Sequence, residues 1–447
     1  MSKFNKVTSS LKNLSTKLAA SLKYKQSGEP GKELNLVGIV GAAGKTTTAY
    51  YLYNIFRAKK VNVASITSQG SFCAGQQLTT IPVDEFTPEQ LFEILQIIQS
   101  KKASIIFLEV TPNLIKNKAL QDLTLQALIL TNLLVKDMED QLERTRAEHI
   151  FSAVHRVKEK GLVVINADEP HTDWLLEQAN KVKQYVFAAW CQKKQLNDVK
   201  LMPEGTSFSI GNQKFSIPAV GEYNLMNIML AIRFAVQYVS LEHIAIILGA
   251  LRPAPARLEL VHTAPAILVD SATNSSRIEH ALQSARLSMK PAGQLVAVIG
   301  AGYTDRAMEI GFLAASIADF IILAPQSTFE LTPAELNQLV WSGIERVHGV
   351  LVDRFDTIEE YKLIDKAKLV LKANESRQSG RVPVFMFDEP IPESRELAID
   401  LAAQLAKPED TIVLAGAGDT RELRLGEGSA AWSELRAVQK VLGQASK

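Results

Sequence analysis

Residues 37–48 read Val-Gly-Ile-Val-Gly-Ala-Ala-Gly-Lys-Thr-Thr-Thr, an apolar run that leads into a glycine-rich turn and then a helix-forming segment. Gly41 and Gly44 allow the backbone to approach a phosphate closely, and the free N–H groups at a helix N-terminus bind anions. Lys45 supplies a point charge, and the hydroxyl of Thr46 is a suitable magnesium ligand. The stretch therefore predicts a strand, a turn and a helix that bind the phosphates of a nucleotide.

The spacing of this loop differs by one residue from that of the common phosphate loop. Its outer glycine is Gly38, because position 39 is isoleucine. A chance glycine turn followed by a lysine is the alternative interpretation. We also include Thr47, next to Thr46, among the candidate nucleotide-binding residues.

Short β-rich runs alternate with helical stretches beyond the loop. Such alternation favours a mostly parallel sheet with helices on both faces, so the predicted fold class is α/β. The strands expected in this part are 36–40, 62–66, 104–110, 127–132 and 162–166, and the helices include 46–59 and 88–100.

The chain of 447 residues is long enough for two or three domains. Leu251-Arg-Pro-Ala-Pro-Ala-Arg257 follows two helical stretches, and its prolines cannot continue a helix. We therefore expect a central P-loop domain over residues 35–250 and a Rossmann-like α/β domain over residues 251–447. The strands expected in the second domain are 267–270, 294–300, 320–324, 384–387 and 411–416.

Residues 1–34 form a basic, serine-rich arm in which apolar residues recur every three or four positions. A helix packed on the body of the protein, or an untidy terminus, is one interpretation of the arm. Weak contact with an anionic membrane surface is the other. No stretch reaches the roughly 20 apolar residues that a membrane-spanning helix needs.

Overall charge and cysteine content exclude several classes of protein. The formal net charge of +1 provides no field that would attract nucleic acid, so any anion site must be local. The two cysteines, Cys73 and Cys191, show neither CxxC spacing nor a nearby histidine pair, so neither a disulfide framework nor a zinc site is predicted. A reducing cytoplasm fits this composition.

Read from Gly38, the loop has the form Gly-x-x-Gly-x-x-Gly-Lys-Thr-Thr-Thr and resembles the nucleotide loop of the Mur ligase superfamily, which includes the peptidoglycan peptide ligases and folylpolyglutamate synthetase. The resemblance extends over residues 35–425 and is greatest to the UDP-N-acetylmuramyl-tripeptide synthetases. Their separate N-terminal UDP-binding domain is not expected, because only about 34 residues precede the first strand. The further motifs, in family order, are Leu78-Thr-Thr-Ile-Pro82, Glu109-Val-Thr111, Thr131-Asn-Leu133, Asn166-Ala-Asp-Glu169, Gly221-Glu-Tyr-Asn224 with Asn227, Arg257-x-Glu259, Asp270 with Asn274, Gly300-Ala-Gly302 with Asp305-Arg306, and Gly416-Ala-Gly418.

Ligases of this superfamily join a carboxylate to an amine with ATP, through an acyl phosphate. The resemblance implies that Lys45, together with Mg²⁺ on Thr46 and Glu109, stabilises the transferred phosphoryl group. Alternatively, Glu109 is a strand-end carboxylate that caps the next turn. Thr79 and Thr80 resemble the family's contact with the UDP-linked acceptor, or are ordinary turn formers.

For nucleotide recognition, the resemblance implies Asn224 and Asn227 near the base, Arg257 on a phosphate, and Asp270 from the second domain. The alternatives are a helix cap for Asn224 and a linker charge for Arg257. Because Lys45 and Asp270 fall in different predicted domains, ATP is expected between the domains, whose closure would exclude water.

Several positions that the family uses for metal binding are altered. The family's Glu-Val-Ser-Ser-His ends here in Asn113, and its Asp-His-x-Asp has become Asp137-Met138-Glu-Asp140 with one residue inserted. The family's carbamylated lysine would fall near Arg146-Ala-Glu-His149, where no lysine occurs. Glu148 is our candidate for an anionic substitute, and an ordinary exposed helix residue is the alternative.

The motifs for the incoming amino acid are altered as well. The family's Asp-Asn-Pro-Arg aligns with Gln326-Ser-Thr-Phe-Glu330, and its Gly-Lys-Gly-His-Glu aligns with Gly416-Ala-Gly-Asp-Thr420. Diaminopimelate or lysine therefore cannot be assigned as the substrate. Arg306 and Arg421 are candidate carboxylate clamps, or exposed charges.

The function predicted from the sequence is ATP-dependent ligation of an amino acid to a carboxylate, with a UDP-muramyl peptide precursor of the cell wall as the expected acceptor. The alternative is a nucleotide-binding protein that has lost catalysis and acts as a regulatory or scaffold partner. The intact phosphate loop fits both interpretations. The altered histidines and the missing lysine are the features that distinguish them. A P-loop ATPase that drives motion is disfavoured, because the second domain resembles a substrate domain.

Overall fold

The computed structural model describes residues 34–117, 119–181, 187–304, 306–329, 331–426 and 428–443. Residues 1–33 of the N-terminal arm, with its expected helix and membrane contact, lie outside the described residues, as do Asp305 and Glu330 of the motifs above. The chain forms two compact units. The first comprises the chain up to Asn197 with Ser209–Phe215 and Met226–Ala250, and the second comprises Asp198–Phe208, Ser216–Leu225 and the chain from Leu251 onward.

The first unit is built on an eight-stranded sheet with the strand order β4-β3-β2-β5-β1-β6-β7-β8. β1 is buried along its whole length and pairs in parallel with β5 and β6, as expected for a central apolar strand covered on both faces. Only the β2-β3-β4 edge is antiparallel. The strands are β1 (Leu36–Val40), β2 (Val63–Thr67), β3 (Gly70–Cys73), β4 (Gln76–Thr79), β5 (Ile105–Glu109), β6 (Leu125–Leu130), β7 (Val157–Asn166) and β8 (Phe187–Cys191).

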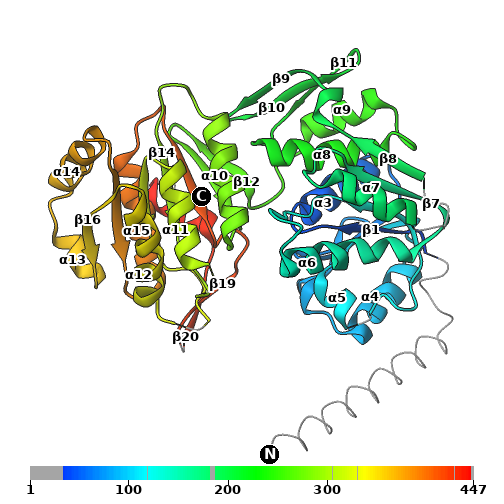
Figure 1. The fold of residues 1–447 in the computed structure, drawn as a ribbon, viewed down its shortest axis with the longest axis horizontal. Coiled ribbons are helices and arrows are strands. Elements are labelled where there is room, and N and C mark those ends of the chain that lie inside the picture. The colour runs from blue at the N-terminus through cyan, green and yellow to red at the C-terminus, as the bar shows by residue number, and fades with distance from the viewer. Residues whose placement is uncertain are drawn as a thin grey trace, which may run out of the picture. The chain divides into compact units, whose positions relative to one another are not determined.

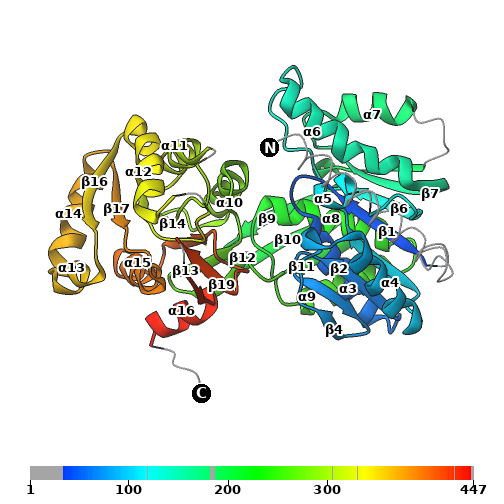
Figure 2. The same cartoon turned by 90° about the horizontal axis from the view of Figure 1, so that it is seen from below.

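Helices cover both faces of this sheet. Figure 2 shows α3 and α9 on one side of β1 and α6 and α7 on the other. Pro88 begins α4, where Thr87 and Gln90 form a reciprocal capping box. The helices are α3 (Lys45–Ala58), α4 (Pro88–Ser100), α5 (Pro112–Lys116), α6 (Gln141–Phe151), α7 (Thr172–Lys181) and α9 (Leu241–Ala250), with short 3₁₀ segments at Val83–Glu85 and Ser152–Arg156.

A small sheet and one helix carry residues of both units. The sheet has the order β11-β10-β9, with β9 (Asn197–Met202), β10 (Gly205–Ile210) and β11 (Gln213–Ile217), and follows the 3₁₀ turn Lys193–Gln195. α8 (Glu222–Ala235) begins in the second unit and continues in the first from Met226.

The second unit contains a seven-stranded sheet with the order β12-β13-β18-β14-β15-β17-β16, parallel except for β12. A two-stranded ribbon, β19 with β20, follows β18. The strands are β12 (Arg257–Thr263), β13 (Ala266–Asp270), β14 (Leu295–Ile299), β15 (Phe320–Leu323), β16 (Gly349–Phe355), β17 (Val382–Phe387), β18 (Thr411–Ala415), β19 (Glu422–Leu425) and β20 (Gly428–Ala431).

Helices also cover both faces of the second sheet. α10, α11 and α12 lie side by side on one face (Figure 1), and α15 and α16 lie on the other (Figure 2). Gly311 and Gly343 allow close packing of α11 on α12, because a methyl group at either would collide with the backbone of the other helix. The helices are α10 (Ser275–Ser288), α11 (Ala307–Ile317), α12 (Pro333–Ile344), α13 (Ile358–Leu363), α14 (Lys366–Gln378), α15 (Pro392–Leu405) and α16 (Glu434–Val441), with a 3₁₀ turn at Glu345–Val347.

The predicted α/β class is confirmed, with mostly parallel sheets in both units. Each predicted strand occurs, and the helix predicted from residue 46 begins at Lys45. Strands β3, β4, β8, β9, β10, β11, β12, β16, β19 and β20 were not predicted. Within the described ranges, no helix has the length and apolar character needed to cross a membrane.

Candidate nucleotide site and substrate residues

The turn between β1 and α3 depends on two glycines. Gly44 has a φ of 80°, in the left-handed region that favours glycine. At Gly41, a methyl group would collide with the hydroxyl of Thr131 and lie 2.9 Å from the carbonyl oxygen of Asn132. Close packing and backbone conformation therefore explain the glycines at both positions.

The sequence predicted Gly38 as the outer glycine of the loop. The structure shows that Gly38 is not part of this turn. It lies inside β1, where a methyl group would come within 2.8 Å of the side chain of Leu125. Thr47 is buried in the first turn of α3, and its hydroxyl has no hydrogen-bond partner among the described residues.

The segment after β6 holds the turn in place. Asn132 accepts hydrogen bonds from the amides of Ala42, at its carbonyl oxygen (3.0 Å), and of Ala43, at its side-chain Oδ1 (2.9 Å). The hydroxyl of Thr131 donates to the carbonyl of Ala43 at 2.6 Å. The sequence singled out Thr131 and Asn132 only as a family motif, and the structure gives them this role.

Lys45, Thr46 and Glu109 come together at the start of α3. Lys45 Nζ donates to the carbonyl of Gly41 at 2.8 Å and lies 3.9 Å from Glu109 Oε1. Thr46 Oγ1 donates to Glu109 Oε2 at 2.9 Å and lies 2.8 Å from Ser68 Oγ. The turn thus places a cation, two hydroxyls and a carboxylate beside the N-terminus of a 14-residue helix.

Sequence reasoning missed Ser68, which follows β2. Its amide donates to Glu109 Oε2 at 3.0 Å. Glu109 is 5% exposed at the end of β5, and its contacts run to Thr46 and Ser68. Thr111, two residues on, is the residue that caps the next helix, α5.

These residues fit a nucleotide phosphate with a divalent metal. A left-handed glycine, a nearby lysine and a helix N-terminus are suited to an anion. The hydroxyls of Thr46 and Ser68 and the carboxylate of Glu109 are oxygen ligands of the kind that a hard cation prefers.

The two asparagines implied by the family resemblance have different surroundings. Asn227 packs on the turn, because its Oδ1 occupies the space that a methyl group at Gly44 would need. Asn224 is the third residue of α8, not its cap, and its Nδ2 donates to the carbonyls of Val220 and Arg257 at 2.8 Å each. Asn224 Oδ1 is buried and has no partner among the described residues.

Arg257 and Asp270 form a buried cluster in the second unit. Asp270 Oδ2 accepts from the hydroxyl of Tyr223 at 2.7 Å and from the amide of Leu258 at 2.9 Å. Arg257 donates to the hydroxyl of Ser271 and, at 3.1 Å, to Asp419 Oδ2. The cluster therefore links β12 and β13 to the segment after β18.

Arg277, on α10, also belongs to this cluster and donates to Ser271 Oγ at 3.0 Å. Burial raises the pKa of Asp270 and raises that of Tyr223 well above its usual range. Burial and the neighbouring guanidinium of Arg257 lower the pKa of Arg277. Sequence reasoning quoted Tyr223 in a motif without a role and missed Arg277.

The altered metal-binding positions have local structural roles. Asn113 Nδ2 donates to the carbonyl of Asp84 at 2.6 Å. Asp140 caps α6 by accepting from the amides of Leu142 and Glu143, both at 2.9 Å. Met138 packs against the core of the first unit.

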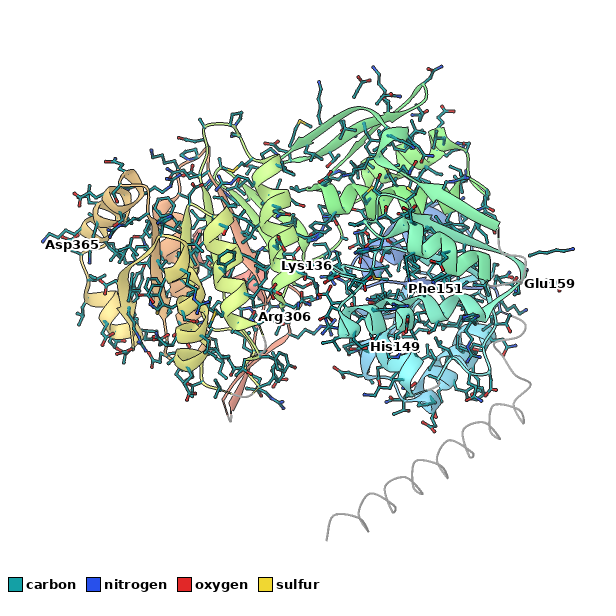
Figure 3. The ribbon with its side chains drawn as sticks, in the orientation of Figure 1. Lys136, His149, Phe151, Glu159, Arg306 and Asp365 are labelled. Carbon is teal, nitrogen blue, oxygen red and sulfur yellow. The ribbon has the colours of Figure 1, made fainter. Side chains whose placement is uncertain are left out.

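Glu148 lies on α6, which also carries the labelled His149 and Phe151 in Figure 3. Its side chain is 53% exposed and accepts from Arg144 Nε at 3.2 Å, one helical turn away. Across the described parts of the chain, no group of three or more His, Cys, Asp or Glu side chains could hold a metal ion.

The predicted substrate residues lie at several separate places. Thr79 ends β4 and accepts from the amide of Ile81 at 3.1 Å, and Thr80 is exposed. Arg306 precedes α11 (Figure 3), with a φ of 61°, and lies 3.7 Å from Glu309 Oε2. Arg421 is exposed, and its carbonyl accepts from the amide of Trp432.

The fold and the phosphate loop agree with comparisons to known proteins. Residues 39–235 match the family model for the Mur ligase middle domain. This part of the chain, which carries the phosphate loop, is therefore similar to the middle domain of the Mur ligases.

Among relatives, the chain is 26% identical over 376 residues to the UDP-N-acetylmuramoyl-L-alanyl-D-glutamate–2,6-diaminopimelate ligase of Helicobacter hepaticus, covering 79% of this chain and 74% of the relative. It is 23% identical over 432 residues to the UDP-N-acetylmuramyl-tripeptide synthetase of Deinococcus radiodurans, covering 93% of this chain and 80% of the relative. Among solved structures, the folylpolyglutamate synthase of Mycobacterium tuberculosis complexed with ADP and AMPPCP has the same fold, with a TM-score of 0.60 at 15% identity over 96% of this chain and 95% of that chain.

Proposed function

We propose that this protein is an ATP-dependent ligase that joins an amino acid to a carboxylate, with a UDP-muramyl peptide as the acceptor. The observation that carries the proposal is the convergence of Lys45, Thr46, Ser68 and Glu109 on the turn before α3. The names of the relatives, which are muramyl-peptide ligases, support the choice of acceptor and reaction.

In this proposal the turn binds the phosphates of ATP, and Lys45 neutralises charge on the phosphoryl group that is transferred. Lys45 Nζ donates to the carbonyl of Gly41, so the ammonium group lies over the turn. Thr46 and Glu109, with Ser68, would hold the divalent metal, which we take to be Mg²⁺. When bound, ATP would supply the phosphoryl group that activates the carboxylate.

The remaining candidate residues belong to the same proposal. Asn224, Asn227, Arg257 and Asp270 are the further proposed nucleotide-binding residues. We propose residues 35–250 and 251–447 as the two functional domains, and the cytoplasm as the location. Thr79, Thr80, Arg306 and Arg421 are the proposed substrate contacts, and of these Arg306 already has an acidic neighbour, Glu309.

The test is release of phosphate from ATP and Mg²⁺, screened across amino acids with a UDP-muramyl peptide. We expect release that depends on one amino acid and stops in Lys45→Ala, with ATP affinity reduced at least about ten-fold because a charged contact to phosphate is lost. Lys59→Ala, which removes an exposed lysine just beyond α3, is the matched control and should behave like the wild type. ATP binding without ligation of any amino acid would favour the regulatory alternative, and equal ATP affinity in Lys45→Ala and the wild type would refute the assigned role of the turn.

A further inference from the structure

A cavity of about 820 Å³ opens at the amino edge of the first sheet. Its lining comes from α5, from residues 120–122 shortly before β6, and from the 3₁₀ segment Ser152–Arg156, which leads into β7. β6 and β7 begin side by side, because Leu125 pairs with Val157. The volume lies within the range of about 300–1,000 Å³ that is typical of small-molecule sites.

This cavity is separate from the nucleotide site. β1 and β6 run in parallel, with Val37 opposite Ala127. The phosphate-binding turn follows the carboxyl end of β1, whereas the cavity lies before the amino end of β6. The six residues of β6 span about 20 Å, so the cavity and the turn lie at opposite ends of the strand.

Arg156 is held at the wall of this cavity. Its Nη1 donates to the carbonyl of Gln121 at 2.8 Å, a contact between two of the lining segments. Its Nε and Nη2 have no partner among the described residues, so both can donate to a ligand. The adjacent His155 packs edge-on against the ring of Phe151, with 6.4 Å between the ring centroids. A guanidinium and an imidazole, which can both donate to an anion, are therefore positioned at the cavity.

Apolar side chains form another part of the lining. Leu120 and Ala153 are buried, and Ile115 packs against the core of the first unit. Asp122 is the acidic residue of the lining, so only the part of the cavity at Arg156 suits an anion. The cavity thus combines one anion-binding group with an apolar surface.

We propose that this cavity binds a small monocarboxylate with an apolar body. The carboxylate would accept hydrogen bonds from Arg156 and His155, and the body would lie against Ile115, Leu120 and Ala153. Hydrogen bonds between a guanidinium and a carboxylate are among the stronger ones in proteins. Such a ligand would bind independently of ATP, because the phosphate-binding turn lies at the other end of β6. The inference therefore concerns a second site, beyond that of the proposed function.

The test uses 4-phenylbutanoate as the probe and compares it with 4-phenylbutanamide and 4-phenylbutylamine, which have the same body with a neutral or a cationic end. Calorimetry on the wild type should give the carboxylate an affinity at least about ten-fold higher than that of either comparison compound, because Arg156 then donates to a charged acceptor. Arg156→Met removes the guanidinium, and its affinity for 4-phenylbutanoate should fall at least about ten-fold, to that of the amide. Affinity for a non-hydrolysable ATP analogue should not change in this variant.

Arg144→Met, at a half-exposed position of α6 outside the lining, is the matched control and should bind 4-phenylbutanoate like the wild type. If Arg156→Met does not fold, Arg156→Gln, which can still donate to the carbonyl of Gln121 but has no charge, should show the same loss. No preference of the wild type for 4-phenylbutanoate, or unchanged affinity for it in a folded Arg156 variant, overturns the inference. Competition between 4-phenylbutanoate and the ATP analogue also overturns it, because the probe would then occupy the nucleotide site.

Discussion

Glu109 joins the phosphate loop to two strands of the first sheet. Its Oε2 accepts from the hydroxyl of Thr46 and the amide of Ser68, and its Oε1 faces Lys45. These contacts hold the carboxylate beside the hydroxyl that is best placed to bind a metal. The side chain is buried, so its effects on metal binding and on folding need separate measurements.

In Glu109→Gln we expect the Mg²⁺ concentration for half-maximal activity to rise about ten-fold, because an anionic ligand becomes a neutral one. Thr46 and Ser68 can still donate to the remaining amide oxygen, so the fold should persist. Magnesium titration of ATP turnover, with circular dichroism of the same samples, measures both effects. An unchanged titration would exclude Glu109 as a metal ligand.

Glu148 provides a second prediction at this scale, together with the absence of lysine from positions 146–149. Its exposed pair with Arg144, one turn away, is worth only about 0.3–0.5 kcal/mol, which is too little to keep the carboxylate from a cation. We expect activity to be independent of bicarbonate, and Glu148→Ala to lower turnover by a large factor at unchanged ATP affinity.

Arg144→Ala removes the same ion pair but keeps the carboxylate, so its turnover should match the wild type. Equal turnover in both variants would identify Glu148 as an ordinary exposed helix residue. Loss of wild-type activity after carbon dioxide is stripped would indicate a carbamylated lysine elsewhere.

Sequence reasoning could identify Gly41, Gly44, Lys45 and Thr46 because they are consecutive or nearly so, and their motif is local. Ser68 could not be found in this way. It reaches Glu109 only because β2 pairs with β5 in the register that places Ile66 opposite Leu108. Arg277 and Arg156 likewise acquire their surroundings from segments far apart in the chain.

At the scale of elements, α15 and α16 are joined by the buried pair of Arg395 and Glu434. Both side chains have 0% exposure, and Trp432 Nε1 also donates to Glu434 Oε2 at 2.8 Å. Such a pair is costly to break, because removal of one partner leaves a buried charge. Arg395 also donates to the carbonyls of Pro325 and Ala415, so the network fixes these helices against the carboxyl ends of β15 and β18.

Arg395→Met should lower the free energy of unfolding by about 3–5 kcal/mol. Lys440→Ala, which breaks the exposed pair of Lys440 with Glu396 on the same two helices, should change it by about 0–1 kcal/mol. Urea unfolding followed by circular dichroism gives both values. A similar small effect in both variants would contradict the structural role of the buried pair.

Elements were predictable where burial makes the strand continuously apolar, as in β1, β5, β14 and β18. β4 is mostly polar and β9 is mostly exposed, and the sequences of both strands resemble those of loops. β16, at the edge of the second sheet, has only two buried residues, Val352 and Phe355, so it lacks the continuous buried run that marks the central strands. These strands form because a neighbouring strand pairs with them, and not because their own sequences are continuously hydrophobic.

At the scale of the whole molecule, each unit has its own hydrophobic core. One core lies within residues 34–175 and belongs to the first unit, and the two faces of the second sheet form further cores within the second unit. Units with separate cores can unfold in separate transitions. A group buried in one unit should then affect the transition of that unit.

Cys191, in the first unit, provides such a group. Burial raises the pKa of its thiol from its ordinary value of 9.0 to about 12, with the nearby Asp168 adding to the effect. Between about pH 9 and about pH 12 the folded unit therefore keeps the thiol proton, whereas the unfolded chain loses it. Ionisation favours the unfolded chain in this range, so the stability of the first unit is unaffected below about pH 9 and falls as the pH rises toward about 12. At pH 10.5 the loss amounts to about 2 kcal/mol. Calorimetry at pH 8 and pH 10.5 measures how much stability each unit loses over this rise in pH. In the first unit, the loss should be smaller in Cys191→Ala than in the wild type by about 2 kcal/mol. In the second unit, the loss should be equal in both proteins. An identical pH response of the first unit in both proteins would mean that this thiol ionises in the folded state as readily as in the unfolded chain.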